Sequence, residues 1–147
     1  MTLKDKLAED LKFSMKSKDT IRKNTVQGIR AAVLQVEMDN KITLDDEGVI
    51  EVIAKELKKR KDVLPDYEKS GREDLIGDLK KEIDVLVGYL PSQLTKEELD
   101  EIVKKSIETV GATSIKDMGK IMADVLPKVK GRADGKMVNE IVRTYLG

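Results

Sequence analysis

The sequence predicts an all-α protein built from several helices. Its 147 residues are 39% hydrophobic but only 3% aromatic, so the apolar content is mostly aliphatic and suits helix packing. Apolar residues recur every three or four positions, and no segment alternates as a strand would. Caps and chain breakers divide the sequence into a larger N-terminal helical subdomain, 1–90, and a C-terminal three-helix bundle, 91–147.

The first two helices are predicted from regular apolar stripes. Thr2 precedes the first helix, and Asp19 can cap the second, which should end near Asn40. Phe13 points away from the inward stripe, either as a second packing contact or as an exposed anchor for a partner. The inward residues are Leu3, Leu7, Leu11 and Met15 in the first helix, and Ile21, Ile29, Ala32, Val33 and Val36 in the second, with Leu34 and Met38 on another face.

The third and fourth helices should complete the N-terminal subdomain. Thr43 followed by Asp46 resembles a capping box, and Pro65 should kink or end the third helix. The fourth helix begins near 72–74 and stops at Pro91; its seven apolar residues fall within about 120° of arc, as expected for a core helix. The inward residues are Ile50, Ile53, Ala54, Leu57 and Leu64, then Leu75, Ile76, Leu79, Ile83, Leu86, Val87 and Leu90.

Three shorter helices are predicted after Pro91. Their starts are marked by Thr95 with Glu98, by Ser114 with Asp117, and by Asp134, and glycines 111 and 131 end the first two. Gly119 lies at the margin of an apolar stripe and should permit close helix contact. Inward positions are Leu99, Ile102, Val103, Ile107 and Val110; Ile115, Met118, Ile121, Met122, Val125, Leu126 and Val129; and Met137, Val138, Ile141, Val142 and Tyr145.

The sequence contains no evident catalytic centre or metal site. It has neither Cys nor His, which removes the thiolate nucleophile, the commonest general base and most transition-metal ligand sets. Paired carboxylates such as Glu97 and Glu98 stand at helix starts, where the helix dipole favours them. We expect no catalytic residue, no bound metal and no cofactor, and an enzyme is the least favoured hypothesis.

Charge and hydropathy also restrict the partners and the compartment. Twenty-eight basic residues balance 28 acidic ones, so the whole chain should not be drawn strongly to membranes or polyanions. The N-terminal segment is charged throughout, and no stretch approaches the roughly 18 apolar residues of a membrane span. We expect a cytoplasmic protein with no membrane partner, in which any nucleic-acid site is local.

The segment KGRADGK, 130–136, is the most specific polar motif. It is predicted to form a turn with exposed backbone N–H groups at a helix start, flanked by three cations, so a phosphate could bind there. Two structural alternatives remain open: Arg132 could satisfy helix C-terminal carbonyls, and Lys136 could pair with Glu140. Residues 112–147 carry net charge +3, whereas residues 95–111 carry −2.

Four ordered motifs carry a resemblance to a known family. They are GREDL (71–75), GYLPSQLT..EL (88–99), GA.S..DMGK.M (111–122) and GRADGK.V (131–138). Together they resemble the YqeY family, and residues 91–147 resemble the C-terminal tail domain of the B subunit of the glutamine-dependent aspartyl/glutamyl-tRNA amidotransferase. The resemblance implies a two-part helical fold and, for the tail, contact with tRNA. The amidotransferase chemistry resides in other parts of that enzyme, so a carbon-nitrogen ligase label would be carried over from the shared tail.

Two functional hypotheses follow. The first is a non-catalytic module that binds structured RNA, above all tRNA, through backbone phosphates and shape. The second is a protein-interaction adaptor that docks on a translation-associated or tRNA-modifying partner through its N-terminal helices. The RNA-binding residues expected under the first hypothesis, all with exposed side chains, are Lys116, Lys120, Lys130, Arg132, Lys136 and Arg143.

Overall fold

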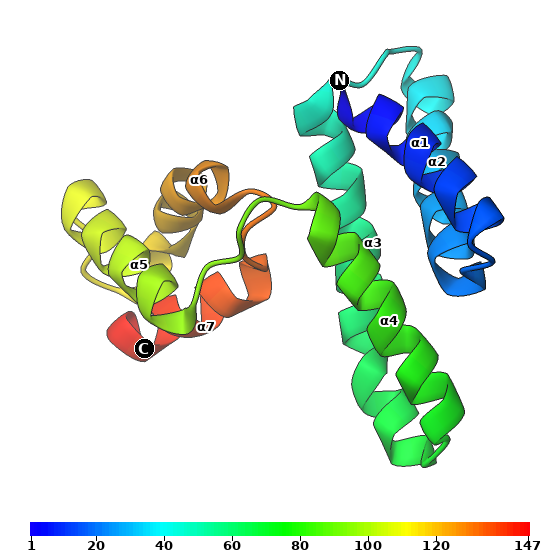
Figure 1. Cartoon of the computed structure of the whole chain (residues 1–147). Coiled ribbons are helices and arrows are strands. Elements are labelled where there is room, and N and C mark those ends of the chain that lie inside the picture. Colours follow the sequence, from blue (N-terminus) through cyan, green and yellow to red (C-terminus); the bar gives the residue numbers. More distant parts are fainter. The chain divides into compact units, whose positions relative to one another are not determined.

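The computed structural model describes all 147 residues and contains seven α-helices, one short 3₁₀ helix and no strand, which confirms the all-α prediction. The chain forms two compact units, Met1–Leu90 and Pro91–Gly147, each with its own hydrophobic core. Figure 1 shows the first unit in blue to green and the second in yellow to red. No helix in either unit is long and apolar enough to cross a membrane.

The N-terminal unit consists of two helical hairpins. Helix α1 (Leu3–Lys16) pairs with α2 (Thr20–Asn40), and α3 (Asp46–Ser70) pairs with α4 (Glu73–Tyr89) (Figure 1). Helix α2 packs on both α3 and α4, and α1 also contacts α3. The buried core residues are Leu7, Val26, Ile29, Val33, Val49, Val52, Ile53, Leu57, Leu86 and Tyr89.

The start of the chain follows the sequence prediction, whereas the end of α1 does not. Thr2 forms a capping box with Asp5, so two helix-end donors are satisfied. Met15, predicted to face inward, is 55% exposed, and Ser14 is buried in its place. The Ser14 hydroxyl donates to the Asp10 carbonyl at 2.7 Å, so this polar group can be buried at low cost. Phe13 is also exposed, which rules out the packing interpretation.

The N-cap of helix α3 lies two residues later in the chain than predicted. Asp45, not Thr43, is the N-cap, and its carboxylate accepts a hydrogen bond from the Gly48 N–H at 2.9 Å. Leu44, the residue before this N-cap, packs against the core of the N-terminal unit, as an apolar residue at that position often does. A Cβ at Gly48 would lie 2.7 Å from Leu44 Cδ2, so a larger residue there would require the Leu44 side chain to move.

The hairpin of α3 and α4 is longer than its core. Pro65 lies inside α3 and does not end it, because the helix continues to Ser70. Leu75, predicted to face inward, is 41% exposed in the first turn of α4. At the opposite end of α4, Tyr89 is buried and its hydroxyl donates to the Asp10 carboxylate of α1. The core contacts of α4 are thus concentrated in its second half.

The C-terminal unit contains α5 (Lys96–Val110), the 3₁₀ helix η1 (Ile115–Asp117), α6 (Met118–Val129) and α7 (Gly135–Leu146). The three α-helices contact one another pairwise, as a small bundle should. The predicted caps Thr95 with Glu98, and Asp134, are confirmed by their hydrogen bonds. The core is formed by Leu99, Val103, Ile121, Val125, Val129, Val138, Ile141 and Val142.

Five predicted packing positions of this unit are wrong. Ile115, Leu126, Met137 and Tyr145 are each at least 40% exposed, since they lie at the edges of stripes that the three-helix core does not cover. Gly119 permits no close helix contact, because a Cβ at that position would meet nothing within 4 Å. Met118 and Met122 do pack against the core, as predicted.

Candidate nucleic-acid interface

The KGRADGK segment forms a turn that is fastened to the first residues of its own unit. The Leu94 N–H donates to the Arg132 carbonyl at 2.9 Å, and the Gln93 side-chain amide donates to the Gly131 carbonyl at 2.7 Å. In return, Arg132 Nε donates to the Ser92 carbonyl at 3.0 Å. Gly131 has a φ of 74°, a conformation that glycine adopts without strain. These three bonds fix the turn against residues 92–94.

Arg132 is consequently a structural residue as well as a cation. The expectation of an exposed side chain is wrong, because Arg132 is half-buried against residues 92–94. The alternative in which it binds helix C-terminal carbonyls is wrong as well, since its acceptor Ser92 lies outside every helix. The guanidinium still carries its charge and further N–H donors, which can face a ligand.

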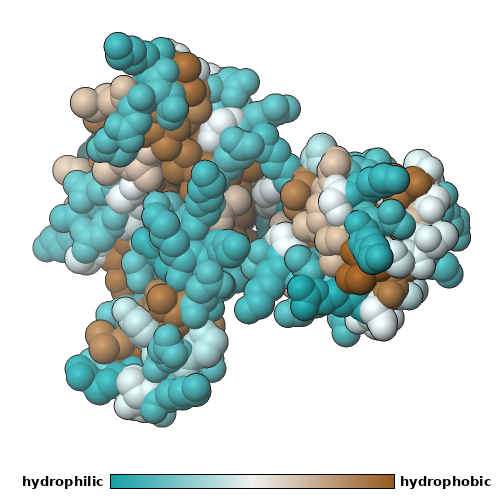
Figure 2. Space-filling model, turned by 180° about the vertical axis from the view of Figure 1, so that it is seen from behind, coloured by the Kyte–Doolittle hydropathy of each residue, from teal (hydrophilic) through white to brown (hydrophobic).

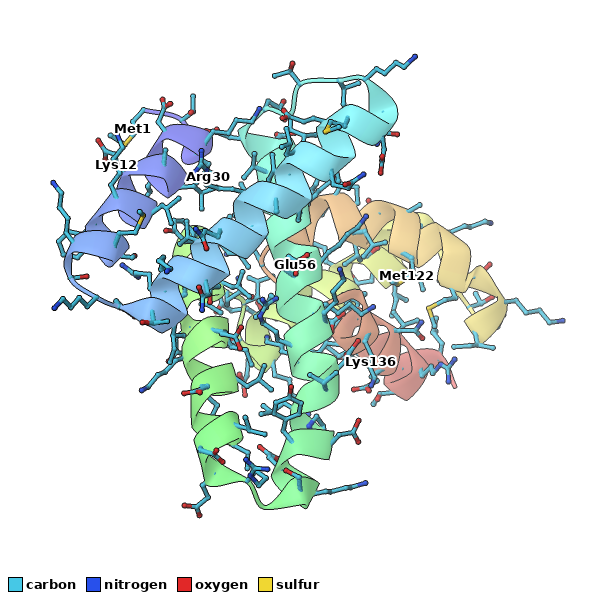
Figure 3. All side chains as sticks on the ribbon, turned by 90° about the vertical axis from the view of Figure 1, so that its right-hand side faces the viewer. Met1, Lys12, Arg30, Glu56, Met122 and Lys136 are labelled. Atoms are coloured by element: carbon cyan, nitrogen blue, oxygen red, sulfur yellow. The ribbon has the colours of Figure 1, made fainter.

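Lys136 and Arg143 lie seven residues apart on one face of α7. Two turns of helix separate them, so they point in nearly the same direction, roughly 10 Å apart along the axis. Lys136 is exposed (labelled in Figure 3), and no ion pair joins it to Glu140, contrary to the second structural alternative. Arg143 Nε donates to the neutral Asn139 amide oxygen at 3.1 Å, so its charge is not compensated there.

Lys116 lies in η1 and Lys120 in the first turn of α6, and both are exposed. Asp117 stands between them, and its carboxylate accepts a hydrogen bond from the Thr113 N–H at 3.0 Å. This bond, with smaller contributions from the Ser114 N–H and the Lys120 charge, holds the pKa of Asp117 below its usual range. Asp117 is therefore ionised and reduces the positive potential at this end of the helix.

Lys130 lies at the opposite end of α6 from Lys120. Ten residues separate the two, which corresponds to roughly 15 Å along a helix. Lys128 lies between them but is paired with Asp124 at 3.2 Å. The Ser106 hydroxyl and then the Lys128 ammonium hold the pKa of Asp124 below its usual range. Lys120 and Lys130 are therefore too far apart along α6 to bind the same phosphate.

The segment that contains α5 is the more acidic part of the C-terminal unit, with three lysines against five carboxylates in residues 95–111. Glu97, Glu101 and Glu108 are exposed on α5, whereas the predicted cations belong to η1, α6, α7 and the connecting turn. Residues 95–111 carry net charge −2 and residues 112–147 carry +3, so a polyanion should be attracted more to η1, α6 and α7 than to α5.

Sequence reasoning missed the residues that hold the turn. Ser92 and Gln93 lie in the short segment between α4 and α5, and each contacts the turn across about 40 positions of sequence. The motif GYLPSQLT contains both residues, but nothing in their local spacing reveals their distant partners. No group of His, Cys, Asp or Glu is arranged to hold a metal ion.

Comparison with known proteins places this architecture in a family. The model of the Yqey-like proteins matches residues 4–146. The chain belongs to the YqeY-like family. The match covers both the N-terminal unit and the bundle that holds the KGRADGK turn, in agreement with the resemblance seen in the four motifs.

Two fungal relatives match nearly the whole chain, and both bear the name altered inheritance of mitochondria protein 41, mitochondrial. The protein of Pyrenophora tritici-repentis is 29% identical over 146 residues, covering 97% of this chain and 80% of the relative. That of Vanderwaltozyma polyspora is 31% identical over 147 residues, covering 95% and 80%. These relatives extend the family to proteins named as mitochondrial.

A shorter similarity leads to an enzyme of tRNA metabolism. The E subunit of the glutamyl-tRNA(Gln) amidotransferase from Thermococcus gammatolerans is 44% identical over 45 residues, which are 31% of this chain and 7% of that protein. The corresponding protein of Saccharolobus solfataricus is 37% identical over 57 residues. This chain therefore shares a segment with these amidotransferase proteins and lacks most of their length.

Proposed function

We propose that this protein is a non-catalytic module that binds structured RNA, with tRNA as the favoured ligand, through its C-terminal unit. The observation that carries the proposal is the similarity to proteins of an enzyme named for glutamyl-tRNA(Gln). Less than a tenth of those proteins is shared, so the proposal transfers a binding property and no amidotransferase or other carbon-nitrogen ligase chemistry.

The chemistry of the C-terminal unit supports backbone recognition. Lys116, Lys120, Lys136 and Arg143 are exposed on η1, α6 and α7, where ammonium and guanidinium groups can contact phosphates. The only aromatic residue of this unit is Tyr145, and its hydroxyl donates to the Asp100 carboxylate at 2.6 Å. Base stacking and sequence readout from unpaired bases would therefore have little to build on, and shape and charge would dominate.

The direct test is a binding titration with unmodified tRNA transcript at low salt. The triple variant Lys116→Ala, Lys120→Ala, Lys136→Ala should bind at least about tenfold more weakly than the native protein, a change of about 1.4 kcal/mol in binding free energy. A matched control removes three exposed lysines of the N-terminal unit: Lys58, Lys61 and Lys80. If both triple variants lose the same affinity, the contact is non-specific, and the proposed interface is wrong.

The second candidate is the adaptor function. Phe13 is 64% exposed on α1, so its aromatic ring is available to a partner protein. Co-purification from cell extract with and without ribonuclease distinguishes the candidates. An RNA-binding module loses its RNA-linked partners after digestion, whereas an adaptor retains them.

The compartment is proposed on the same basis. The cytoplasm is one candidate location, and the fungal relatives with mitochondrial names make the mitochondrion the alternative. Both compartments hold tRNA. Subcellular fractionation of the source cells decides between them without affecting the binding test.

A further inference from the structure

A groove runs along the hairpin of α1 and α2 in the N-terminal unit, which the proposed RNA interface does not use. It has a volume of about 310 Å³ and is lined by Lys4, Leu7, Arg30, Ala31, Val33, Leu34 and Glu37. Leu7 and Val33 also belong to the core, so the floor of the groove is apolar and held in place by the packed interior. Figure 2 shows hydrophobic side chains reaching the surface over this part of the N-terminal unit.

Helix α2 exposes two large apolar side chains here, Leu34 in the lining of the groove and Met38 one turn beyond it. Leu34 and Met38 are 57% and 65% exposed, four residues apart and therefore on one face of α2. Other side chains of the same helix, Val26 and Ile29, are buried in the core. Helix α2 thus satisfies its packing without Leu34 and Met38. These two neighbouring side chains, together with the apolar floor of the groove, offer apolar contact area to a partner.

The carboxylate in the groove is already satisfied. Glu37 forms an ion pair with Lys4, and it also accepts a hydrogen bond from the Leu44 N–H at 2.7 Å. These two contacts, the Lys4 contact being the larger, hold the pKa of Glu37 below its usual range. Glu37 is therefore ionised and neutralised by its own neighbours.

The remaining charge in the groove is positive. Arg30 is exposed and has no hydrogen-bond or ion-pair partner in the structure; Figure 3 labels it on α2. Lys23 lies outside the groove lining, seven residues earlier on the same side of α2; it is partly buried, and its ammonium group is likewise unpaired. Along α2 the surface therefore changes from cationic at Lys23 and Arg30 to apolar at Leu34 and Met38.

We propose that this groove binds an acidic amphipathic helix of a partner protein. The apolar stripe of such a helix would cover Leu34 and Met38, and its carboxylates would pair with Arg30 and Lys23. A helix laid between two antiparallel helices is a common mode of peptide recognition, with apolar anchors three and four residues apart. A second copy of this chain fits less well, because a symmetric contact through this face would bring its cations toward one another.

The test uses the full chain and a designed peptide of about four helical turns as probe. One peptide carries leucines at helical spacing flanked by glutamates; a second has the same leucines flanked by lysines; a third has the glutamate composition in scrambled order. Fluorescence anisotropy of each labelled peptide measures affinity, and amide chemical shifts locate the contact. We expect the glutamate peptide to bind at least about tenfold more tightly than either other peptide, with shifts confined to α1 and α2.

Two surface variants separate the apolar contribution from the charge contribution. Leu34→Asp should abolish binding of the glutamate peptide, whereas Leu126→Asp, at an exposed leucine of the C-terminal unit, should not change it. Arg30→Glu should weaken the glutamate peptide about tenfold and favour the lysine peptide. The control Lys80→Glu, on the exposed face of α4, should leave both affinities unchanged. Because all four side chains are exposed, the fold should persist, and circular dichroism checks this.

Three outcomes would overturn the proposal. Equal binding of the glutamate and lysine peptides would remove the role of Arg30, and shifts centred on another helix would remove the groove. A concentration-dependent dimer in analytical ultracentrifugation that Leu34→Asp dissociates would identify a second copy as the occupant. None of these outcomes depends on tRNA binding by residues 91–147, so the two proposals can fail separately.

Discussion

Arg132 Nε donates a hydrogen bond to the backbone carbonyl of Ser92 at 3.0 Å, joining the turn before α7 to the segment before α5. The neighbouring bonds from Leu94 and Gln93 close the same junction. Arg132, which belongs to the motif most specific for anion binding, therefore also stabilises the structure of its own unit. A loss of RNA affinity in an Arg132 variant could therefore result from the lost contact with RNA or from the lost hydrogen bond to Ser92.

Arg132→Ala should destabilise the C-terminal unit, whereas Lys136→Ala should not. Removal of one hydrogen bond to a carbonyl costs about 1 kcal/mol of unfolding free energy, and Lys136 has no comparable side-chain contact. Chemical denaturation of both variants measures the difference, and hydrogen exchange of the Leu94 amide should accelerate only in Arg132→Ala. Identical midpoints for the two variants would mean that the Ser92 contact contributes nothing to stability.

The salt dependence of tRNA binding should reflect a small number of phosphate contacts. Four exposed cations, Lys116, Lys120, Lys136 and Arg143, predict a log–log slope of roughly 3 to 4, taking about 0.9 per phosphate as for duplex DNA. Lys116→Ala combined with Lys120→Ala should lower the slope by about 2. Titrations at several salt concentrations provide the measurement. An unchanged slope in the double variant would place the contact elsewhere.

Tyr89 should make the N-terminal unit sensitive to alkaline pH. Burial and then the bond to Asp10 raise the pKa of Tyr89 far above 10. Between the unfolded pKa of about 10 and the raised folded pKa, the unfolded chain loses this proton while the folded chain keeps it, so stability falls as pH rises. Denaturation series from pH 8 to pH 11 should show this fall in the native protein and a smaller one in Tyr89→Phe.

The matched control for that series is Tyr67→Phe, which removes a partly exposed tyrosine hydroxyl of α3 in the same unit. At neutral pH, Tyr89→Phe should cost about 1 kcal/mol through the lost hydrogen bond and the Asp10 carboxylate left without its donor. If the slopes of the native protein and Tyr89→Phe coincide, Tyr89 is not the group that titrates.

The same substitution at two glycines of the C-terminal unit should have opposite effects. Gly119→Ala should stabilise the unit by about 0.5 kcal/mol, because the residue lies in α6 in open surroundings and alanine loses less backbone entropy. Gly111→Ala should destabilise it by about 1 kcal/mol, because Gly111 ends α5 with a φ of 69°. Thermal unfolding of both variants checks the signs.

Several elements of the fold are decided by residues close together in sequence. The starts of α1, α5 and α7 follow from Thr2, Thr95 and Asp134, because each side chain bonds an N–H two or three residues ahead. The end of α5 follows from Gly111, the residue that most easily adopts a left-handed conformation. Such interactions are complete within one helical turn, so the sequence alone could predict them.

The candidate interface was predicted only in part. Lys116, Lys120, Lys136 and Arg143 could be assigned to exposed helix faces from periodicity, and the structure leaves them exposed. The half-burial of Arg132 could not be predicted, because its acceptor Ser92 is 40 residues away. The sequence indicated the groove of α1 and α2 only through the second apolar face of α2, at Leu34 and Met38. The ion pair of Glu37 with Lys4 could not be predicted, because it forms only when α1 and α2 pack together.

The sequence by itself determined that this chain is all helical, where most helices begin and end, and which family it belongs to. Those properties rest on local hydrogen bonding and on motifs readable in order along the chain. The tertiary structure alone decided that Tyr89 is buried while Met15, Met137 and Tyr145 are exposed. Periodicity determines the direction in which a side chain points from its helix. Burial also requires that another helix covers that position, and this depends on how the helices pack.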